Sequence, residues 1–442
     1  MRGAPPFFYI FISRGWKGAE IWSPHFKKQS FNYFLKRTVK KMKKDAPKGS
    51  IISKLLDITQ VKWFSRWLMI GFLCQSVLIG GGYATGRELV EFFMMNGLAE
   101  GLYGMVVSTV CFALVGILTF DYARKFRLYN YRSFFKSLLP GSTWLVFEAG
   151  YIFLVVLVGG ILSSAAGTIL QQWFGISYWV GVTVLLVGTS ILLFAGGKVI
   201  STILSYWSFF LYAVMFIFLV ATVRHFGMDG VFGSFIRDHG VATSSNWLMG
   251  GIKYTLYNMV SFLLVLYALQ DIIKTRRDAV INGIVASILM MIPAFIEYLA
   301  MAPVFPAVLE ESVPIFGILK GHLGGGVLLS AYVLMLFGTS IETITGFVHG
   351  LNERINSVYQ EKGGEMSPKM RGVVGLAVLV VCFICAKAGL VALIARGYSF
   401  MAWYFLAVMV IPLATVGLMR LRGKEMPAVP DKFEEAKVHV EP

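Results

Sequence analysis

A run of small residues interrupts the first long apolar segment of the chain: Gly80-Gly81-Gly82-Tyr83-Ala84-Thr85-Gly86, followed at once by Arg87-Glu88. Residues 67–86 carry no charge and are long enough to cross a bilayer as a helix. Each glycine weakens a helix by about 1 kcal/mol relative to alanine. In lipid, unwound backbone is tolerated only where protein covers it or where it lines a cavity. The run therefore predicts a bend or break around a ligand, with tight helix packing as the alternative.

Two other polar groups lie within apolar segments, namely Tyr257-Asn258 and Thr339-Ser340. An asparagine at mid-membrane depth is costly unless it finds partners. The adjacent hydroxyls of Thr339 and Ser340 can hydrogen-bond to their own preceding carbonyls. They can equally coordinate a hard cation, which prefers oxygen ligands. Both interpretations of this pair stay open.

Charged residues inside membrane spans are functional candidates by default. The candidates of this kind are Arg87, Glu88, Glu148, Glu297, Glu342 and Lys387. We expect Arg87 and Glu88, just beyond the glycine run, to gate a path from the outside. Glu342, one turn from Thr339-Ser340, is the third gate candidate. A further pattern, Gly159, Ser163 and Gly167 at four-residue spacing, predicts a helix-packing face.

The composition defines a polytopic membrane protein, because 57% of residues are hydrophobic, 14% are charged and the mean hydropathy is +0.69. The net charge of +16 lies in loops and in the N-terminal tail, so we expect no nucleic-acid partner. The sequence has no phosphate-binding loop, no H-E-x-x-H and no G-x-S-x-G, and its six histidines do not cluster. We therefore expect no enzymatic activity, no cofactor and no resident metal. Cys382 and Cys385 are interpreted as small buried residues rather than a redox pair.

Hydropathy predicts an all-α chain of ten transmembrane spans. They cover 64–95 (broken at the glycines), 101–123, 143–173, 178–195, 198–223, 247–270, 279–301, 325–350, 372–394 and 398–420. Residues 303–324 are too polar and proline-rich to span, which predicts a short extracellular hairpin. The distribution of Lys and Arg among the loops places both termini in the cytoplasm of a cell-membrane protein.

These predictions divide the chain into a transmembrane domain at 63–421 and two cytoplasmic tails. The tail at 1–62 is basic and is predicted to be disordered, and the C-terminal tail covers 422–442. If 63–225 and 246–421 are inverted repeats, the sixth span should be interrupted like the first. That span carries Gly250-Gly251 and Tyr257-Asn258. Two broken helices would expose N–H groups and carbonyls at mid-membrane depth, where they can bind an anionic group beside a cationic one.

The segment Ser76-Val-Leu-Ile-Gly-Gly-Gly-Tyr-Ala-Thr-Gly-Arg-Glu-Leu-Val-Glu-Phe-Phe93 resembles the first-span signature of YkvI-like membrane proteins. These form a branch of the amino acid–polyamine–organocation (APC) superfamily. Tyr257-Asn258, Thr339-Ser340 and Ala388-Gly-Leu-Val-Ala-Leu are similar to other recurrent features of that family, and the resemblance covers about 64–420. The resemblance implies the LeuT fold, with two inverted five-helix repeats and with spans 1 and 6 discontinuous at a central site.

The resemblance also implies roles for individual residues. The substrate would lie against Gly81, Gly82, Tyr83, Tyr257, Asn258 and Ser261. A Na⁺ ion would be held by the carbonyls of Val77, Gly80 and Leu336 and by the hydroxyls of Thr339 and Ser340. Arg87 matches an arginine that closes the outer gate in some members. The chain departs from the pattern in having Thr-Ser rather than Thr-Thr, and in lacking a proline after the break in span 6.

The predicted function is secondary active transport of a small amino-acid-like or other organic solute by alternating access, coupled to Na⁺. The partners are that solute and the lipid bilayer. A proton-coupled transporter is one alternative, and Lys198 at the start of span 5 is a candidate replacement for the sodium ion. A non-transporting sensor or partner subunit on the same fold is the other alternative. A channel is disfavoured because no repeated pore-lining segment appears.

Overall fold

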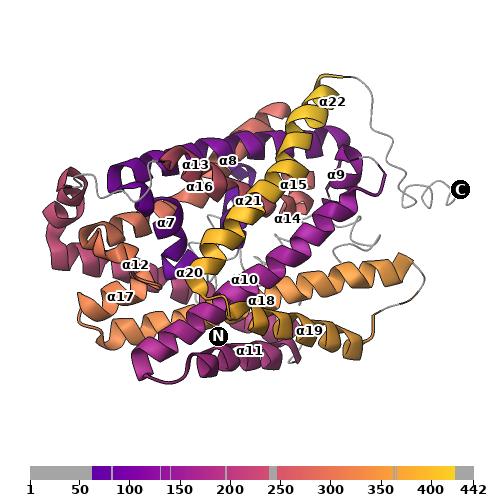
Figure 1. Cartoon of the computed structure of the whole chain (residues 1–442). Coiled ribbons are helices and arrows are strands. Elements are labelled where there is room, and N and C mark those ends of the chain that lie inside the picture. Colours follow the sequence, from indigo (N-terminus) through magenta and orange to yellow (C-terminus); the bar gives the residue numbers. More distant parts are fainter. Residues whose placement is uncertain are drawn as a thin grey trace, which may run out of the picture.

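The computed structural model describes residues 62–80, 83–129, 131–139, 141–194, 197–237, 246–361, 364 and 366–423, in which helices and turns occur without any strand (Figure 1). The first span is divided into short pieces: α5 (Lys62–Trp67), α6 (Met69–Leu78), the 3₁₀ turn η2 (Tyr83–Thr85), α7 (Arg87–Phe92) and the turn η3 (Met94–Asn96). The next four spans are α8 (Leu98–Phe126), α10 (Trp144–Phe174), α11 (Tyr178–Phe194) and α12 (Gly197–Arg237), with the short α9 (Tyr131–Leu138) between α8 and α10.

The second half follows the same order. Its divided first span consists of α13 (Trp247–Asn258), α14 (Val260–Leu264) and α15 (Leu266–Ile272). Three spans follow as α16 (Arg276–Met301), α18 (Gly326–Glu361) and α19 (Pro368–Ala386), with η4 (Ala302–Val304), η5 (Ala307–Leu309) and α17 (Pro314–Gly321) between α16 and α18. The last span runs through α20 (Leu390–Ala392), η6 (Leu393–Tyr398), α21 (Ser399–Phe405), η7 (Leu406–Val410), η8 (Leu413–Gly417) and α22 (Leu418–Arg422).

The lengths and surfaces of these helices identify a multi-pass membrane protein. Among the described residues, seven helices are long and apolar enough to cross a membrane, and α11 adds a shorter apolar stretch. Spans 1 and 6 are absent from that set because each is divided. On α8, the exposed side chains of Tyr103, Val106, Val110 and Leu114 recur every three or four residues, which places one apolar stripe toward lipid.

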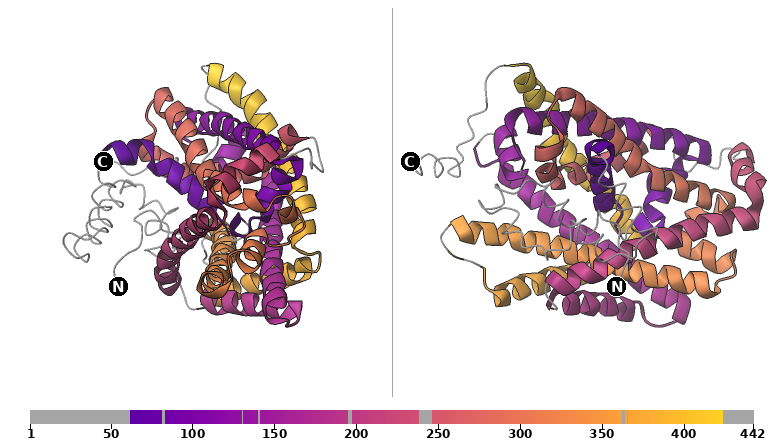
Figure 2. Two further views of the ribbon diagram at one scale, coloured as in Figure 1. Left: turned by 90° about the vertical axis from the view of Figure 1, so that its left-hand side faces the viewer. Right: turned by 180° about the vertical axis from the view of Figure 1, so that it is seen from behind.

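The packing of the helices shows the two related halves. Helix α6 packs against α16 just as α13 packs against α8, and α11 packs against α18 just as α19 packs against α10 (Figures 1 and 2). Each contact therefore recurs with the equivalent helices of the other half, as expected for two five-helix repeats. The predicted fold class is confirmed, including the interruption of spans 1 and 6.

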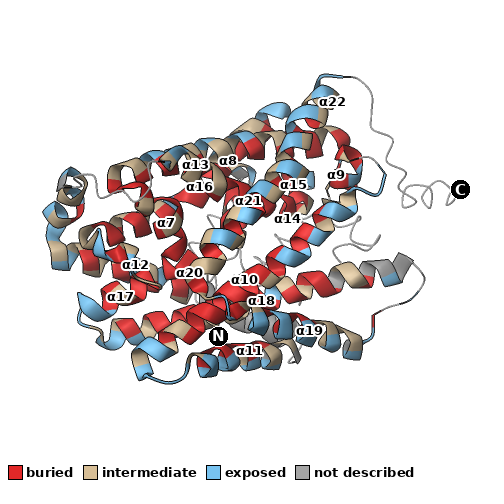
Figure 3. Cartoon of the chain, in the orientation of Figure 1, coloured by how far each residue is buried: buried red, intermediate tan, exposed pale blue. Residues whose placement is uncertain are grey.

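Helix α10 runs through the interior and is mostly buried along its middle (Figure 3). Glycines permit its close contacts. A Cβ atom on Gly159 would overlap the Cys382 sulfur, and one on Gly167 would lie 2.8 Å from the Tyr178 ring. Both positions therefore serve helix packing, as the four-residue spacing predicts. Cys382 is a buried free thiol in this interface.

Three helix boundaries differ from those predicted by hydropathy. Span 9 ends at Ala386 rather than near residue 394, because the chain turns at Gly389, whose φ of 83° excludes a continuing helix. Helix α18 continues to Glu361, beyond the apolar stretch. Helix α12 continues to Arg237 through a kink at Gly227, where φ is 71°. Hydropathy reports where lipid-compatible residues stop, whereas a helix can continue past them, as α12 and α18 do, or turn earlier at a glycine such as Gly389.

Candidate substrate and ion site

The interruption of span 1 is the centre of the candidate site. Helix α6 ends at Leu78 and η2 begins at Tyr83; the predicted substrate residues Gly81 and Gly82 lie outside the described residues. The Tyr332 hydroxyl of α18 donates a hydrogen bond to the Ala84 carbonyl at 3.0 Å. Gly86 then adopts a φ of 77° before α7 begins. A residue with a side chain is strained at this angle, so Gly86 allows the chain to change direction before α7 begins.

Glu88 joins three elements on the side of the break predicted to face outward. The Tyr257 hydroxyl of α13 donates a hydrogen bond of 2.6 Å to Oε2 of Glu88, and both residues are buried. The Tyr257 ring stacks on that of Tyr398 from η6, with centroids 4.2 Å apart and planes 9° apart. Tyr398 itself interacts with the Glu88 carboxylate. Spans 1, 6 and 10 therefore meet at one acidic side chain.

Arg87, the neighbour of Glu88, points to the hairpin between α16 and α18. Its Nη1 donates hydrogen bonds to the carbonyls of Leu309 at 2.9 Å and Glu311 at 3.0 Å. Its Nη2 forms an ion pair of 3.1 Å with Glu91, and the side chain is only 2% exposed. Arg87 thus ties α7 to the predicted outer hairpin.

The structure adds Tyr254 to the predicted site residues and brings the charged candidate Glu297 within electrostatic reach of them. Oε2 of Glu297 on α16 and the hydroxyl of Tyr254 on α13 are buried without a hydrogen-bond partner, as is the hydroxyl of the predicted Tyr83. Tyr83 interacts electrostatically with Glu297, Tyr254 and Glu88. Tyr254 lies one turn from Tyr257 on the same helix face, a spacing that was available in the sequence. Nothing in the sequence pattern connects Glu297 to span 1.

The proposed cation ligands on α18 have the properties that such ligands need. Thr339 and Ser340 are buried, and neither side-chain oxygen has a hydrogen-bond partner. Leu336 is also buried, and Val77 is half-buried. A Cβ atom on Gly80 would lie 3.5 Å from the Thr343 hydroxyl oxygen, so the break in span 1 faces this stretch of α18 one turn beyond Thr339.

Of the remaining predicted residues, Asn258 lies at the end of α13, Ser261 lies in the following α14, and Glu342 lies on α18. Asn258 is half-buried and donates a hydrogen bond to the Tyr254 carbonyl at 3.1 Å, while Ser261 donates one to the Asn258 carbonyl at 2.8 Å. Both therefore satisfy backbone groups where α13 ends. Glu342 is not brought together with Arg87 and Glu88; it lies on α18, within electrostatic reach of Tyr212 on α12.

The glycine pair of span 6 serves packing rather than a break. A Cβ on Gly250 would overlap the Phe92 carbonyl, and a Cβ on Gly251 would overlap the Gly104 carbonyl. The pair sits inside α13 and brings it against α7 and α8. The interruption of span 6 comes later, at Met259 and Val265.

Ion pairs join the helices at the opposite, predicted inner end. Nη1 of Arg354 lies 3.0 Å from Oε2 of Glu148, which links α18 to α10. The Arg354 guanidinium also lies 3.4 Å from the ring centroid of Tyr151 and 4.1 Å from that of Tyr131. At the start of span 1, Arg66 of α5 pairs at 2.9 Å with Asp278 in the first turn of α16. These contacts hold several spans together away from the break.

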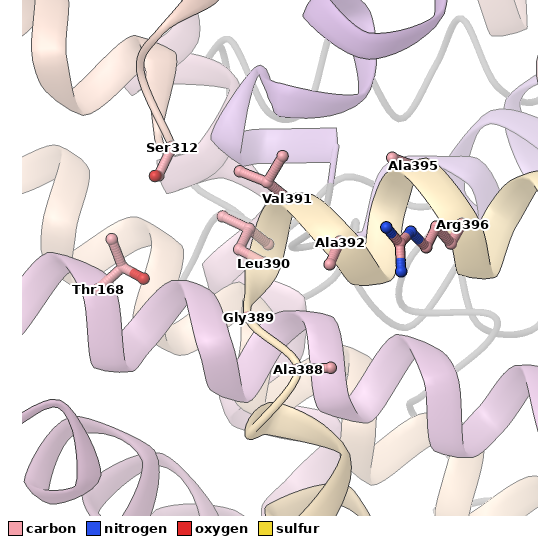
Figure 4. Close-up of a pocket in the computed structure, with 9 residues that line it drawn as sticks. All are labelled: Thr168, Ser312, Ala388, Gly389, Leu390, Val391, Ala392, Ala395 and Arg396. Atoms are coloured by element: carbon pink, nitrogen blue, oxygen red, sulfur yellow. The ribbon is translucent and has the colours of Figure 1, made fainter.

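A cavity of about 520 Å³ opens beside the predicted outer hairpin (Figure 4). It is lined by Thr168, Ser312, Ala388, Gly389, Leu390, Val391, Ala392, Ala395 and Arg396. Ser312 follows Glu311, whose carbonyl accepts the Arg87 hydrogen bond, and Arg396 precedes Tyr398 by two residues. The cavity lining is therefore adjacent in the chain to the hairpin contact of Arg87 and to Tyr398.

Solved structures identify the class of fold. The chain is similar in fold to a manganese transporter from Eremococcus coleocola, with a TM-score of 0.51 over 87% of this chain and 84% of that chain at 14% sequence identity. This likeness and the packing of the repeats define a LeuT-like all-α membrane fold. No family model matches the sequence.

Among curated proteins, the chain is similar to the uncharacterized membrane protein YkvI of Bacillus subtilis. The two are 21% identical over 345 residues, which cover 76% of this chain and 92% of YkvI. The uncharacterized protein YyaD of the same organism is 22% identical over 305 residues, covering 66% of this chain and 80% of YyaD. The similarity to YkvI extends the resemblance seen in the first span to most of the chain.

Proposed function

We propose that the chain is a secondary active transporter of a small amino-acid-like or other organic solute, working by alternating access. The observation that carries this proposal is the break in span 1, around which buried polar side chains have hydrogen-bonding atoms without partners. A membrane protein keeps such costly groups where a ligand satisfies them. Broken helices that meet at the interface of two repeats are typical of transporter binding sites.

In this proposal the solute lies against Gly81, Gly82, Tyr83, Tyr257, Asn258 and Ser261. The contacts of Glu88 and Arg87 close the site toward the predicted outside, since one joins spans 1, 6 and 10 and the other ties α7 to the hairpin. Opening this side would require both to break. Glu342 is a third gate candidate, from its position on α18.

Sodium coupling is supported by the oxygen atoms of α18. Thr339 and Ser340 have buried, unpartnered hydroxyls, which are ligands suited to a hard cation. Na⁺ would be held by these hydroxyls and by the carbonyls of Val77, Gly80 and Leu336. Coupling then means that Na⁺ and solute stabilise the same conformation, so each raises the affinity of the other. A proton is the second candidate, because the buried Glu88 and Glu297 and the half-buried Glu342 have no ion-pair partner among the described residues.

Thermal unfolding of the purified protein with a panel of amino acids, amines and osmolytes tests the proposal. A solute should raise the unfolding temperature more in Na⁺ than in K⁺, and the same solute should accumulate in proteoliposomes under an inward Na⁺ gradient. Thr339→Val should weaken apparent Na⁺ affinity by about tenfold or more. Thr183→Val, at an exposed hydroxyl on α11 that bonds only the Trp179 carbonyl, is the matched control.

The outcomes separate the alternatives. If the rise in unfolding temperature caused by the solute depends on pH and not on Na⁺, the coupling ion is a proton rather than sodium. Solute binding without accumulation under any ion gradient would favour a sensor.

A further inference from the structure

Two buried carboxyl groups lie near the break in span 1 without a basic partner. Glu88 on α7 is 5% exposed, and Glu297 on α16 is 3% exposed. The two interact electrostatically. No ion pair of the described residues includes either of them. Residues almost 210 positions apart thus place two potential negative charges in one water-excluded region.

Two phenol groups with unused hydrogen-bonding capacity lie within electrostatic reach of both acids. The hydroxyls of Tyr83 and Tyr254 are buried without a partner, as is Oε2 of Glu297. Both tyrosines interact electrostatically with both glutamates. The unpartnered atoms come from η2, α13 and α16, three elements within electrostatic reach of one another. Buried polar atoms without a partner inside the protein are typical of sites that bind a ligand or water.

The neighbouring base does not neutralise this region. Arg87 follows η2 after Gly86, and its Nη1 and Nη2 are engaged by the Leu309 and Glu311 carbonyls and by Glu91, while its Nε is buried without a hydrogen-bond partner. An uncompensated buried carboxylate is strongly disfavoured, so each of these acids either takes up a proton or is met by a positive charge from outside the chain. Because the two acids lie beside the predicted substrate residues, a cationic solute can supply that positive charge.

We propose that Glu88 and Glu297, with the hydroxyls of Tyr83 and Tyr254, bind a protonated amine of the transported solute, and that the site prefers solutes without a neighbouring carboxylate. The inference rests on the proposed function, whose substrate class it specifies. An ammonium group offers several N–H donors to the two carboxylates, and the surrounding phenol rings favour a cation. A carboxylate on the solute would be repelled by the same two acids.

Matched pairs of probes test this inference, since the members of each pair differ only in one carboxylate. The pairs are pentylamine with L-norleucine, and cadaverine with L-lysine. Apparent dissociation constants are measured from thermal unfolding of the purified full chain in Na⁺. We expect each amine to bind at least about tenfold more tightly than its amino acid. Glu297→Gln should weaken amine binding by about 30-fold or more, because it removes one charge of a buried pair.

Two further variants control for folding. Tyr83→Phe deletes a hydroxyl that has no internal partner, so it should leave the unliganded unfolding temperature unchanged and weaken amine binding about fivefold. Glu100→Gln, at a half-buried acid at the start of α8, should bind amines as the wild type does.

Equal or tighter binding of the amino acids overturns the inference, as does wild-type amine affinity in Glu297→Gln and Tyr83→Phe. A wild type that neither amine stabilises also overturns it. Failure of the proposed function has a different signature: amines bind through Glu297, but none accumulates in proteoliposomes under any ion gradient.

Discussion

Replacement of Arg87 by glutamine should release the predicted outer hairpin from α7. The guanidinium donates to two backbone carbonyls, those of Leu309 and Glu311, and is 2% exposed. The loop it holds contains amide hydrogen bonds of its own, from Leu309 to the Pro306 carbonyl and from Glu310 to the Ala307 carbonyl. These amides report how often the loop opens.

The magnitude follows from the number and type of the lost contacts. A hydrogen bond to a charged group contributes about 1.5–3 kcal/mol, so the two carbonyl contacts together contribute about 3 kcal/mol or more. The ion pair with Glu91 adds little, because Glu91 is partly exposed and can be solvated after the substitution. A free-energy change of about 3 kcal/mol corresponds to about a 100-fold change in the opening equilibrium.

Hydrogen–deuterium exchange measures that equilibrium directly. In Arg87→Gln, the amides of residues 309–311 should exchange about 100-fold faster than in the wild type, while those of α19 keep their rates. Arg396→Gln, which changes an exposed arginine on the same predicted side, is the control. Unchanged exchange in residues 309–311 would refute the clamp, and equal acceleration throughout the protein would show global destabilisation instead.

Two other substitutions test the packing that positions the site. Gly250→Ala should lower the free energy of unfolding by about 1–3 kcal/mol, because its Cβ would overlap the Phe92 carbonyl, whereas Gly346→Ala has open space inside α18 and should be neutral or stabilising. SDS titration measures both, and similar losses at the two positions would contradict the packing role of Gly250. Arg354→Gln should lower the free energy of unfolding by about 3 kcal/mol, because it leaves Glu148 without its ion-pair partner. Adding Glu148→Gln should recover part of that loss in the same titration. No recovery would mean that the contacts of Arg354 with the aromatic rings, rather than its charge, dominate.

Features of the site that depend only on residues adjacent in the sequence were predictable from the sequence. The break in span 1 was predictable because glycine lowers the stability of the helix at its own position. Within a membrane, unwound backbone is tolerated only where protein covers it or where it lines a cavity. The ten spans were likewise predictable, since hydropathy is a property of each segment taken alone. The boundary between spans 9 and 10 was wrong, because mostly apolar residues lie on both sides of the turn at Gly389 and hydropathy does not register the turn.

Two features of the site came only from tertiary structure. Gly250-Gly251 looks like a break in sequence, but it is a contact surface because the carbonyls of Phe92 and Gly104 lie against it. Glu297 looks like one of several charges within spans, but the packing of α16 beside the first span brings it within electrostatic reach of Glu88 and Tyr83. The sequence by itself determined that the chain crosses the membrane many times and breaks its first span. Which acids surround that break was decided by helix packing, because the partners are about 200 residues apart and no local pattern relates them.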